Sequence, residues 1–374
     1  MTAGPDTPSP DGATAVRTGF AEIAGWQADD QAAAFATFLA SCRAVMAGAP
    51  ALRPALDALP RLKTVCARAL ALPGQVDTPA ARAFFEAHFT PYRIVPPSGA
   101  GFLTGYYEPE TDGSLTPSTA FPAPVLGRPK DLVTLQPGEV RGTLDPALAA
   151  ARQTPDGLVP FAERAEILAG ALAGQGLEQL YLRDDAEVFI IQVQGSARVR
   201  LPDGRKVRLV YAGRNGHPYT SIGRLLINEG RIAQADMSLE RLMGWLRANP
   251  AEARRVMSAN KSYVFFQKFE EGDAALGPVG GAGIALTPGR SIAIDRTIWP
   301  YGLPVFLSAH VDTLPTHEGT LARLMVAQDT GSAILGPARA DYFWGSGAEA
   351  GRRAGLTRHP LGFTVLWPKP VPQP

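Results

Sequence analysis

The last third of this chain is divided into short apolar runs that are separated by turn residues. Six such runs occur: Tyr263–Gln267, Gly283–Leu286, Ser291–Ile294, Leu303–Leu307, Leu324–Gln328 and Gly362–Trp367. Runs of this length, bounded by Gly, Pro, Asn and Asp, are typical of β-strands. Because no long helical stretch separates them, the pattern predicts a closed β-barrel rather than a parallel sheet wound with helices.

The preceding residues predict a mixture of helices and strands. Residues 1–15 are polar and Pro-rich, which indicates a disordered leader. Helical spacing of apolar residues follows from Gly25 to about Leu70, and Thr78-Pro79 begins a further helix. Strands are predicted at Gly101–Tyr107, Tyr181–Leu182, Val188–Gln194 and Val207–Tyr211, and helices at Phe161–Ala173, Ser221–Glu229, Ser238–Arg247 and from Asn249-Pro250 onward.

The charge balance argues against two classes of partner. The chain of 374 residues has 36 basic and 35 acidic side chains, a net charge of +1. Nucleic acids and anionic membranes attract strongly basic proteins, so neither partner is expected. No run of about 18 apolar residues occurs, and no transmembrane span is predicted. A neutral, polar substrate such as a glycan fits this composition better.

The two cysteines, Cys42 and Cys66, lie in helical segments that are separated by several prolines. A helical hairpin could bring them together as a disulfide in an oxidising compartment, but two buried thiols fit the spacing equally well. Neither cysteine belongs to a metal-binding pattern, and the five histidines show no ligand spacing. No metal site and no cofactor are therefore expected.

Three aspartates in the last third are candidates for acid–base chemistry. Asp295 and Asp329 each follow an apolar run, and Asp341 lies between a Gly/Ala/Pro loop and Gly345-Ser-Gly347. Burial at such a position raises the pKa of a carboxyl group into the range useful for catalysis. A single aspartate more often caps a turn. Three of them on neighbouring barrel strands favour a shared site.

Several motifs, in order along the chain, resemble those of the MltA family of membrane-bound lytic murein transglycosylases. They cover roughly residues 20–368: Thr104-Gly-Tyr-Tyr-Glu-Pro109, Gln192-Val-Gln-Gly-Ser196, Tyr211-Ala-Gly213, Asn215-Gly216, Tyr219-Thr-Ser-Ile-Gly223, Lys261-Ser-Tyr-Val-Phe-Phe-Gln267, Leu286–Asp295, Ala327-Gln-Asp329 and Asp341-Tyr-Phe-Trp-Gly345. The last three resemble the C-terminal three-aspartate domain of that family.

The resemblance implies a mainly β fold with flanking helices, a double-psi β-barrel into which a smaller β-rich domain is inserted. Residues 16–105 and 262–370 then form the barrel with its N-terminal helices. Residues 106–261 form the insert and the other wall of a glycan groove. Asp341 corresponds to the family's acid/base, with Asp295 and Asp329 as the other two aspartates. The implied substrate-binding residues are Thr104, Tyr106, Gln194, Gly195, Ser196, Lys261 and Gln267.

The implied reaction cleaves the β-1,4 bond between N-acetylmuramic acid and N-acetylglucosamine in peptidoglycan and leaves 1,6-anhydro ends. One aspartate suffices, because the C6 hydroxyl of the sugar replaces water as the nucleophile. Two alternatives remain open on the same fold. One is a hydrolase with two carboxylates, in which Asp329 or Asp295 activates water. The other is a non-catalytic, expansin-like protein that binds the cell wall.

The resemblance also implies a location and partners. Peptidoglycan lies outside the cytoplasmic membrane, so a periplasmic protein associated with the outer membrane is expected, with glycan strands and other cell-wall enzymes as partners. The N-terminal residues show neither the basic and apolar regions of an export signal nor a lipid-anchor cysteine.

Overall fold

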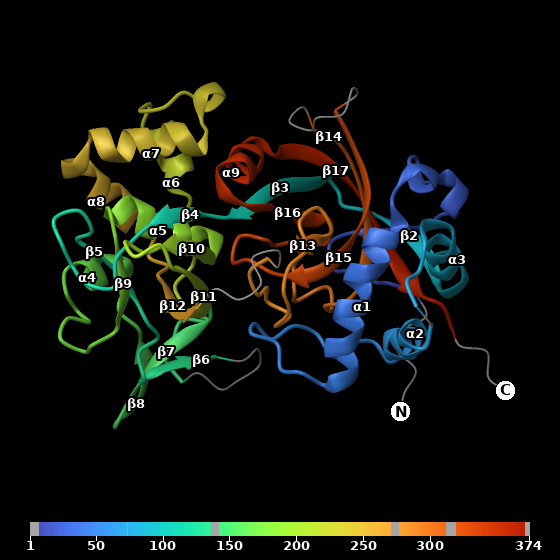
Figure 1. Ribbon diagram of the computed structural model, residues 1–374, viewed down its shortest axis with the longest axis horizontal. Coiled ribbons are helices and arrows are strands. Elements are labelled where there is room, and N and C mark those ends of the chain that lie inside the picture. The colour runs from blue at the N-terminus through green and yellow to red at the C-terminus, as the bar shows by residue number, and fades with distance from the viewer. Residues whose placement is uncertain (1–6, 73, 136–141, 271–276, 312–318, 371–374) are drawn as a thin grey trace. The chain divides into compact units, whose positions relative to one another are not determined.

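The computed structural model describes residues 7–72, 74–135, 142–270, 277–311 and 319–370. The chain divides into two compact units. Unit 1 comprises Met1–Tyr107, Ala275–Gly345 and Arg353–Pro374, and unit 2 comprises Glu108–Ala274 and Ser346–Arg352. Figure 1 labels the elements of both units.

Unit 1 contains a sheet of eight strands in the order β1-β2-β17-β14-β15-β13-β16-β3. The strands are β1 (Thr14–Arg17), β2 (Phe89–Val95), β3 (Gly101–Glu108), β13 (Ser291–Ala293), β14 (Pro304–His310), β15 (Thr320–Asp329), β16 (Arg339–Ser346) and β17 (Arg358–Pro368). The long strand β17 pairs with β14 and β2, and its first residues pair with β3. The expected β-rich character of this part is therefore confirmed.

Three N-terminal helices pack on this sheet: α1 (Gln31–Ala47), α2 (Pro60–Leu70) and α3 (Thr78–His88). Asp30 caps α1 by accepting a hydrogen bond from Ala33 N at 3.2 Å, and Asp77 caps α3 in the same way at 2.9 Å. Buried phenylalanines from α1, α3 and the start of β2 then pack edge to face, at Phe35, Phe38, Phe84, Phe85 and Phe89. Each buried ring contributes roughly 1.5–3 kcal/mol, so the predicted helices are held firmly over the sheet.

The sheets of unit 2 are smaller. The main sheet has the order β12-β11-β10-β4, with a β5-β9 pair and a three-stranded β6-β7-β8 sheet. These strands are β4 (Glu110–Asp112), β5 (Ala123–Leu126), β6 (Leu132–Thr134), β7 (Ala150–Thr154), β8 (Gly157–Pro160), β9 (Glu178–Leu182), β10 (Ser196–Arg200), β11 (Lys206–Arg214) and β12 (Val264–Glu270). The helices are α4 (Arg164–Leu168), α5 (Asp185–Gln194), α6 (Ile222–Asn228), α7 (Leu239–Ala248) and α8 (Pro250–Ser258). Helix α9 (Gly347–Leu356) is divided between the two units.

The strand predicted at Val188–Gln194 is wrong, because these residues form most of helix α5. Asp184 caps the helix by accepting from Glu187 N at 2.8 Å, and Gly195 ends it with a φ of 84°. The helix lies between two hydrophobic clusters: Val188 belongs to one, and Phe189 belongs to the other. Both sides are therefore apolar, and the helical period is hidden in the sequence.

Three further predictions need correction. Gly283–Leu286 is not a strand, since only an isolated bridge joins Ala285 to Val279. The strand that contains Tyr263–Gln267 is real but pairs with β11, so residues 262–270, which were expected in the barrel domain, belong to unit 2. The helix predicted at Phe161–Ala173 is limited to Arg164–Leu168. In the predicted leader, strand β1 already begins at Thr14, while residues 1–6 lie outside the described residues.

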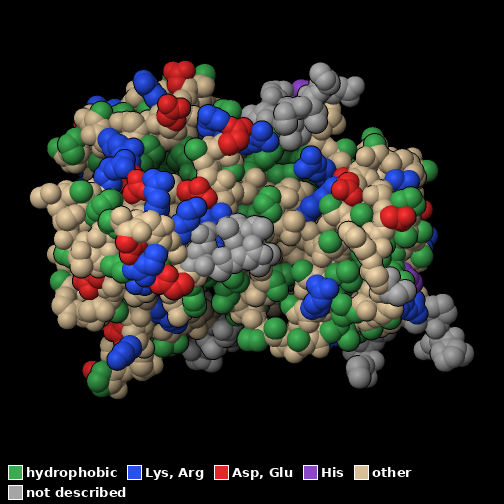
Figure 2. Space-filling view, viewed as in Figure 1, with side chains coloured by type: hydrophobic (Ala, Val, Ile, Leu, Met, Phe, Trp, Pro, Cys, Tyr) green, Lys and Arg blue, Asp and Glu red, His purple; other side chains and the backbone are tan. Residues whose placement is uncertain are grey.

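Charged side chains of both signs are interspersed over the face shown in Figure 2. This distribution agrees with the net charge of +1 and gives that face no extended field of one sign. Among the described residues, none of the helices combines the length and the apolar character needed to cross a bilayer.

Candidate active site

Two of the three aspartates lie on either side of one small residue in the sheet of unit 1. Ala293 on β13 is the register partner of Asp329 on the parallel strand β15. It is also the partner of Asp341 on the antiparallel strand β16. Residues in register point to the same face of a sheet, and strands two places apart are separated by roughly 9–10 Å. The register of β13 and β15 shifts between Ile292 and Ala293, so the strand register alone does not fix the face of Asp329, but its negative charge acts on the Asp341 carboxyl.

Asp341 is half-buried, and its Oδ1 accepts a hydrogen bond of 2.5 Å from the hydroxyl of Thr104. Burial raises the pKa of the Asp341 carboxyl to about 6. The positive charge of Arg339 and the Thr104 hydrogen bond oppose this increase, while the negative charge of Asp329 adds to it. Dense protein surroundings act on this carboxyl although part of the side chain reaches solvent. Asp341 is thus able to hold a proton and to exchange it near neutral pH.

Two backbone amides hold the carboxylate of Asp329 in place. Its Oδ1 accepts hydrogen bonds from Gly281 N at 2.7 Å and from Thr330 N at 2.8 Å. Two amide donors on one oxygen fix the carboxylate in a single orientation. Its charge therefore acts on Asp341 from a defined position.

Asp295 has a different environment, because three donors occupy both of its oxygens. Thr297 donates from its N–H at 3.0 Å and from its hydroxyl at 2.6 Å, and Gly336 N donates at 2.7 Å. The side chain is 5% exposed. These contacts are those of a carboxylate that joins two loops, so the turn-capping interpretation describes Asp295 better than proton transfer does.

Tyr106 lies beside the aspartates and is 8% exposed, with its ring centroid 5.2 Å from that of Phe343. Burial raises the pKa of its hydroxyl well above the usual value, and the charges of Asp329 and Asp341 raise it further. The positive charge of Arg53 acts in the opposite direction. The hydroxyl interacts with Asp329 electrostatically, but its geometry falls short of a good hydrogen bond. The ring therefore packs against Phe343 with little of its surface exposed.

The remaining predicted binding residues belong to unit 2, where most of them lie close together. Gln194 and Gly195 end helix α5 and lead directly into Ser196 on β10. Ser196 and Gln267 are both register partners of Val210 on β11. Four of the five residues thus meet at one place, with Ser196 buried and Gln267 exposed.

Lys261 does not belong to this group. It precedes β12 by several residues, and its ammonium forms an exposed ion pair of 2.7 Å with Glu163. Exposed pairs of this kind contribute little to stability.

Arg339 is a member of the site that the sequence interpretation missed. Its guanidinium donates to the hydroxyl of Thr104 at 2.8 Å and to the carbonyl of Ala340 at 2.6 Å. A strand places residues two apart on the same face. Had residues 339–346 been recognised as a strand, the spacing from Arg339 to Asp341 would have indicated this neighbour.

No metal centre is evident in the parts of the chain that the structure describes, since no group of three or more His, Cys, Asp or Glu is placed to hold an ion. The cysteines are joined in a disulfide, with Cα atoms 4.9 Å apart, so the bridged alternative applies to this structure.

Sequence families divide the chain much as the fold does. Residues 102–267 match the MltA specific insert domain, and residues 290–367 match the 3D domain. The second match contains Asp295, Asp329 and Asp341, and the first contains the group formed by Gln194, Gly195, Ser196 and Gln267.

Solved structures and curated proteins agree with these matches. A membrane-bound lytic murein transglycosylase from Agrobacterium tumefaciens superposes with a TM-score of 0.85 at 36% identity, covering 95% of this chain and 98% of that one. MltA from Neisseria gonorrhoeae gives a TM-score of 0.76 at 31% identity, covering 98% of each chain. Membrane-bound lytic murein transglycosylase A of Vibrio cholerae is 35% identical over 277 residues, which span 72% of this chain and 65% of that protein.

Fold and site together define a protein of the 3D-domain class, with Asp329 and Asp341 on strands of one sheet, Asp295 just beyond strand β13, and a separate β-rich insert. Within that class, the chain belongs to the MltA family of lytic murein transglycosylases.

Proposed function

We propose that this protein is a lytic transglycosylase that cleaves peptidoglycan with Asp341 as its single acid and base. The observation that carries the proposal is the state of the Asp341 carboxyl group. Its pKa is raised to about 6 by burial, and its Oδ2 has no hydrogen-bond partner among the described residues. A carboxyl group with an available oxygen and a pKa near neutrality suits general acid–base catalysis.

The reaction requires two proton transfers at the same residue. Protonated Asp341 gives its proton to the glycosidic oxygen as the bond to the anomeric carbon breaks. The resulting carboxylate then accepts the proton of the C6 hydroxyl of the same sugar, whose oxygen attacks the anomeric carbon. The proton count of the enzyme is restored, and a 1,6-anhydro end is formed without water. An intramolecular nucleophile has a large effective concentration, so a second carboxylate is not required.

Asp329 and Asp295 support this chemistry in different ways. The charge of Asp329 favours the protonated form of Asp341 before cleavage. Asp295, with both oxygens occupied, holds the adjoining loops in place. We infer that neither acts as the proton donor to the leaving sugar.

The substrate proposal rests on the relatives. The aligned regions span 65% and 53% of the lengths of the Vibrio cholerae and Escherichia coli proteins named membrane-bound lytic murein transglycosylase A. Escherichia coli MltA, with a TM-score of 0.65 and 26% identity to this chain, has been crystallised with bound chitohexaose. We infer that glycan strands contact Gln194, Gly195, Ser196 and Gln267 here, with Thr104, Tyr106 and Lys261 as further candidates.

Two further points are part of the proposal. The pairing of β17 with β3 as well as β14, and the parallel pairing of β13 with β15, support a double-psi β-barrel for unit 1. The Cys42–Cys66 disulfide and the membrane-bound relatives support a periplasmic location, because disulfides persist in oxidising compartments.

The decisive experiment is digestion of purified murein sacculi, followed by mass spectrometry of the soluble products. Muropeptides that end in 1,6-anhydro sugars are lighter by one water than those with reducing ends. Anhydro ends from the wild type, and none from Asp341→Asn, would support the proposal. Reducing ends would instead support a two-carboxylate hydrolase, and binding without release of muropeptides would support a non-catalytic wall-binding protein.

A further inference from the structure

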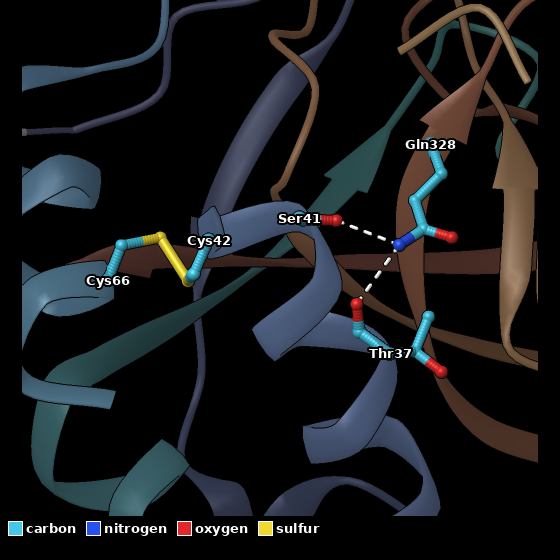
Figure 3. Close-up of a disulfide and its surroundings, with 5 residues drawn as sticks. All are labelled: Thr37, Ser41, Cys42, Cys66 and Gln328. Atoms are coloured by element: carbon cyan, nitrogen blue, oxygen red, sulfur yellow. Dashed lines mark hydrogen bonds between the residues drawn. A yellow bond between two sulfur atoms is a disulfide. The ribbon is translucent and has the colours of Figure 1, made fainter. Parts of the chain in front are cut away.

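The loop between α1 and α2, residues 48–59, is closed at its base by the disulfide. Cys42 lies on α1 and Cys66 on α2, and both side chains are fully buried. Figure 3 shows the bridge between the two helices. We call residues 48–59 the bracketed loop.

The bracketed loop contacts the same two residues that Asp329 holds. The backbone N–H of Arg53 donates to Gly281 O at 3.0 Å, and its guanidinium donates to Thr330 O. Asp329 accepts hydrogen bonds from the N–H groups of Gly281 and Thr330. Arg53 therefore holds the carbonyls of both residues, while Asp329 holds their amides.

Other contacts seat the loop against the neighbouring segments. The Tyr301 hydroxyl donates to the carbonyl of Arg53 at 3.0 Å, and Leu56 N donates to Arg296 O at 3.2 Å. At Gly283, whose φ is +80°, an added Cβ would lie 3.1 Å from the carbonyl oxygen of Pro50. The positive φ favours glycine there, and the close approach of the loop adds to that preference.

Helix α1 is bonded to the strand residue that precedes Asp329. The amide of Gln328 donates to the carbonyl of Thr37 at 3.0 Å and to the hydroxyl of Ser41 at 2.8 Å, as Figure 3 shows. Its oxygen accepts from the hydroxyl of Ser291 at 2.6 Å. Ser41 is next to Cys42 in the chain, so the disulfide, the helix and the end of β15 form one connected network.

We propose that Arg53 is a positioning residue for the active site, and that the disulfide-closed element α1–loop–α2 fixes Asp329 relative to Asp341. This inference rests on the proposed function. Three contacts support it: Gly281 and Thr330 are held by Arg53, and Gln328 is held by α1. An error of about 1 Å in the placement of catalytic groups lowers rates by up to ~10²-fold, so the contacts that place Asp329 affect turnover.

The test compares four variants with the wild type at a temperature well below each melting transition. Arg53→Ala removes the guanidinium that donates to Thr330 O, Arg53→Lys keeps a donor for Thr330 O, and Tyr301→Phe removes the hydroxyl that donates to the Arg53 carbonyl. Arg43→Ala is the matched control, since Arg43 is an exposed cation on α1. For each protein, hydrogen exchange is measured at the amides of Gly281 and Thr330, together with kcat and KM on soluble murein glycan strands.

We expect Arg53→Ala to accelerate exchange at both amides and to lower kcat about tenfold or more, with KM changed less than about threefold. Arg53→Lys should restore part of both effects, Tyr301→Phe should show smaller changes in the same direction, and Arg43→Ala should show none.

The possible outcomes separate this inference from the proposed function. Unchanged exchange in Arg53→Ala overturns the inference whatever the activity. Faster exchange with unchanged kcat also overturns it, because the Arg53 contacts would then stabilise the fold without affecting the reaction. If the wild type releases no anhydro products, the proposed function fails, while faster exchange would still establish Arg53 as the residue that holds the Asp329 segment.

Discussion

The hydroxyl of Thr104 donates its only hydrogen to Oδ1 of Asp341, across 2.5 Å. The direction of this bond is fixed, because the same hydroxyl accepts an N–H from Arg339 at 2.8 Å. Oδ1 is therefore an acceptor, and the proton of the neutral acid lies on Oδ2. In the proposed mechanism this bond lets Thr104 orient Asp341, a role beyond the sugar contact expected of it.

The pH dependence of wild-type activity follows from the raised pKa of Asp341. General-acid catalysis requires the protonated carboxyl, so kcat/KM should fall as pH rises through about 6. The measurement is the initial rate of release of soluble muropeptides between pH 4 and pH 9. An alkaline limb near the ordinary pKa of an aspartate would contradict the assignment.

Thr104→Val and Arg339→Met should each move that alkaline limb to higher pH. The Thr104 hydrogen bond and the Arg339 charge both lower the pKa of Asp341 from the value that burial alone would give, so losing either one raises it. We expect shifts of about half to one pH unit. Arg358→Met is the control, because Arg358 is an exposed cation on β17 next to Thr104 in the ladder.

Asp329→Asn should move the limb in the opposite direction, to lower pH. Its negative charge raises the pKa of Asp341, and the amide oxygen of asparagine can still accept from Gly281 and Thr330. Activity near pH 7 should therefore fall while activity near pH 5 is largely kept. Loss of activity at every pH in a well-folded variant would favour a hydrolase with two carboxylates.

These site contacts were only partly predictable from the sequence. The three aspartates were found because each lies beside small or apolar residues. Arg339 was missed because β16 begins inside a loop-like run, Gly336-Pro-Ala-Arg339, whose composition hides the strand. Arg53 could not be predicted at all, because it reaches Thr330 from 277 residues away through tertiary packing alone.

The fold, too, was only partly predictable from the sequence. Helix α5 was predicted as a strand because its apolar residues serve two clusters and leave no polar face. Strand β12 was placed in the wrong unit because strand propensity does not say which neighbour a strand pairs with. The N-terminal helices, in contrast, carry clear start signals, because aspartates cap α1 and α3 and a proline begins α2.

The disulfide should stabilise unit 1 substantially. A bridge between residues with a sequence separation of 24 contributes about 3–4 kcal/mol by restricting the unfolded chain. The double variant Cys42→Ser, Cys66→Ser should therefore melt at a lower temperature than the wild type, and thiol titration of the denatured wild type without reductant should find no free thiols. Two titratable thiols in protein purified from the periplasm would remove the bridge from the native state.

The group on unit 2 should affect glycan binding more than chemistry. Gln267→Ala and Gln194→Ala should weaken binding of chitohexaose by about threefold to tenfold each, because each loses a polar side chain able to contact a sugar. Isothermal calorimetry on the Asp341→Asn background avoids turnover. Gln153→Ala, an exposed glutamine on β7, is the control. Wild-type affinity in both variants would withdraw these residues from the proposed binding site.

Replacing Asp341, the proposed acid, should separate chemistry from stability. Asp341→Asn is nearly isosteric, but an amide neither donates the catalytic proton nor takes one back, so activity should fall at least ~10²–10⁴-fold. At high pH, the same substitution should make the protein more stable than the wild type. A carboxyl whose pKa rises from 3.8 to about 6 on folding is most stabilising below pH 3.8, and that contribution is lost as pH rises through about 6. The loss is at most about 3 kcal/mol, and less because the side chain is partly exposed.

The wild type should therefore lose stability relative to Asp341→Asn between pH 4 and pH 8, as thermal melts at several pH values would show. Asp295→Asn supplies the contrast, since its new NH₂ group would face either Gly336 N or the Thr297 donors. An unsatisfied pair of this kind costs about 1–3 kcal/mol at every pH. A folded Asp295→Asn protein should melt earlier yet keep most of its turnover at low temperature. If Asp295→Asn were inactive without a change in melting temperature, Asp295 rather than Asp341 would have to be reconsidered as the proton donor.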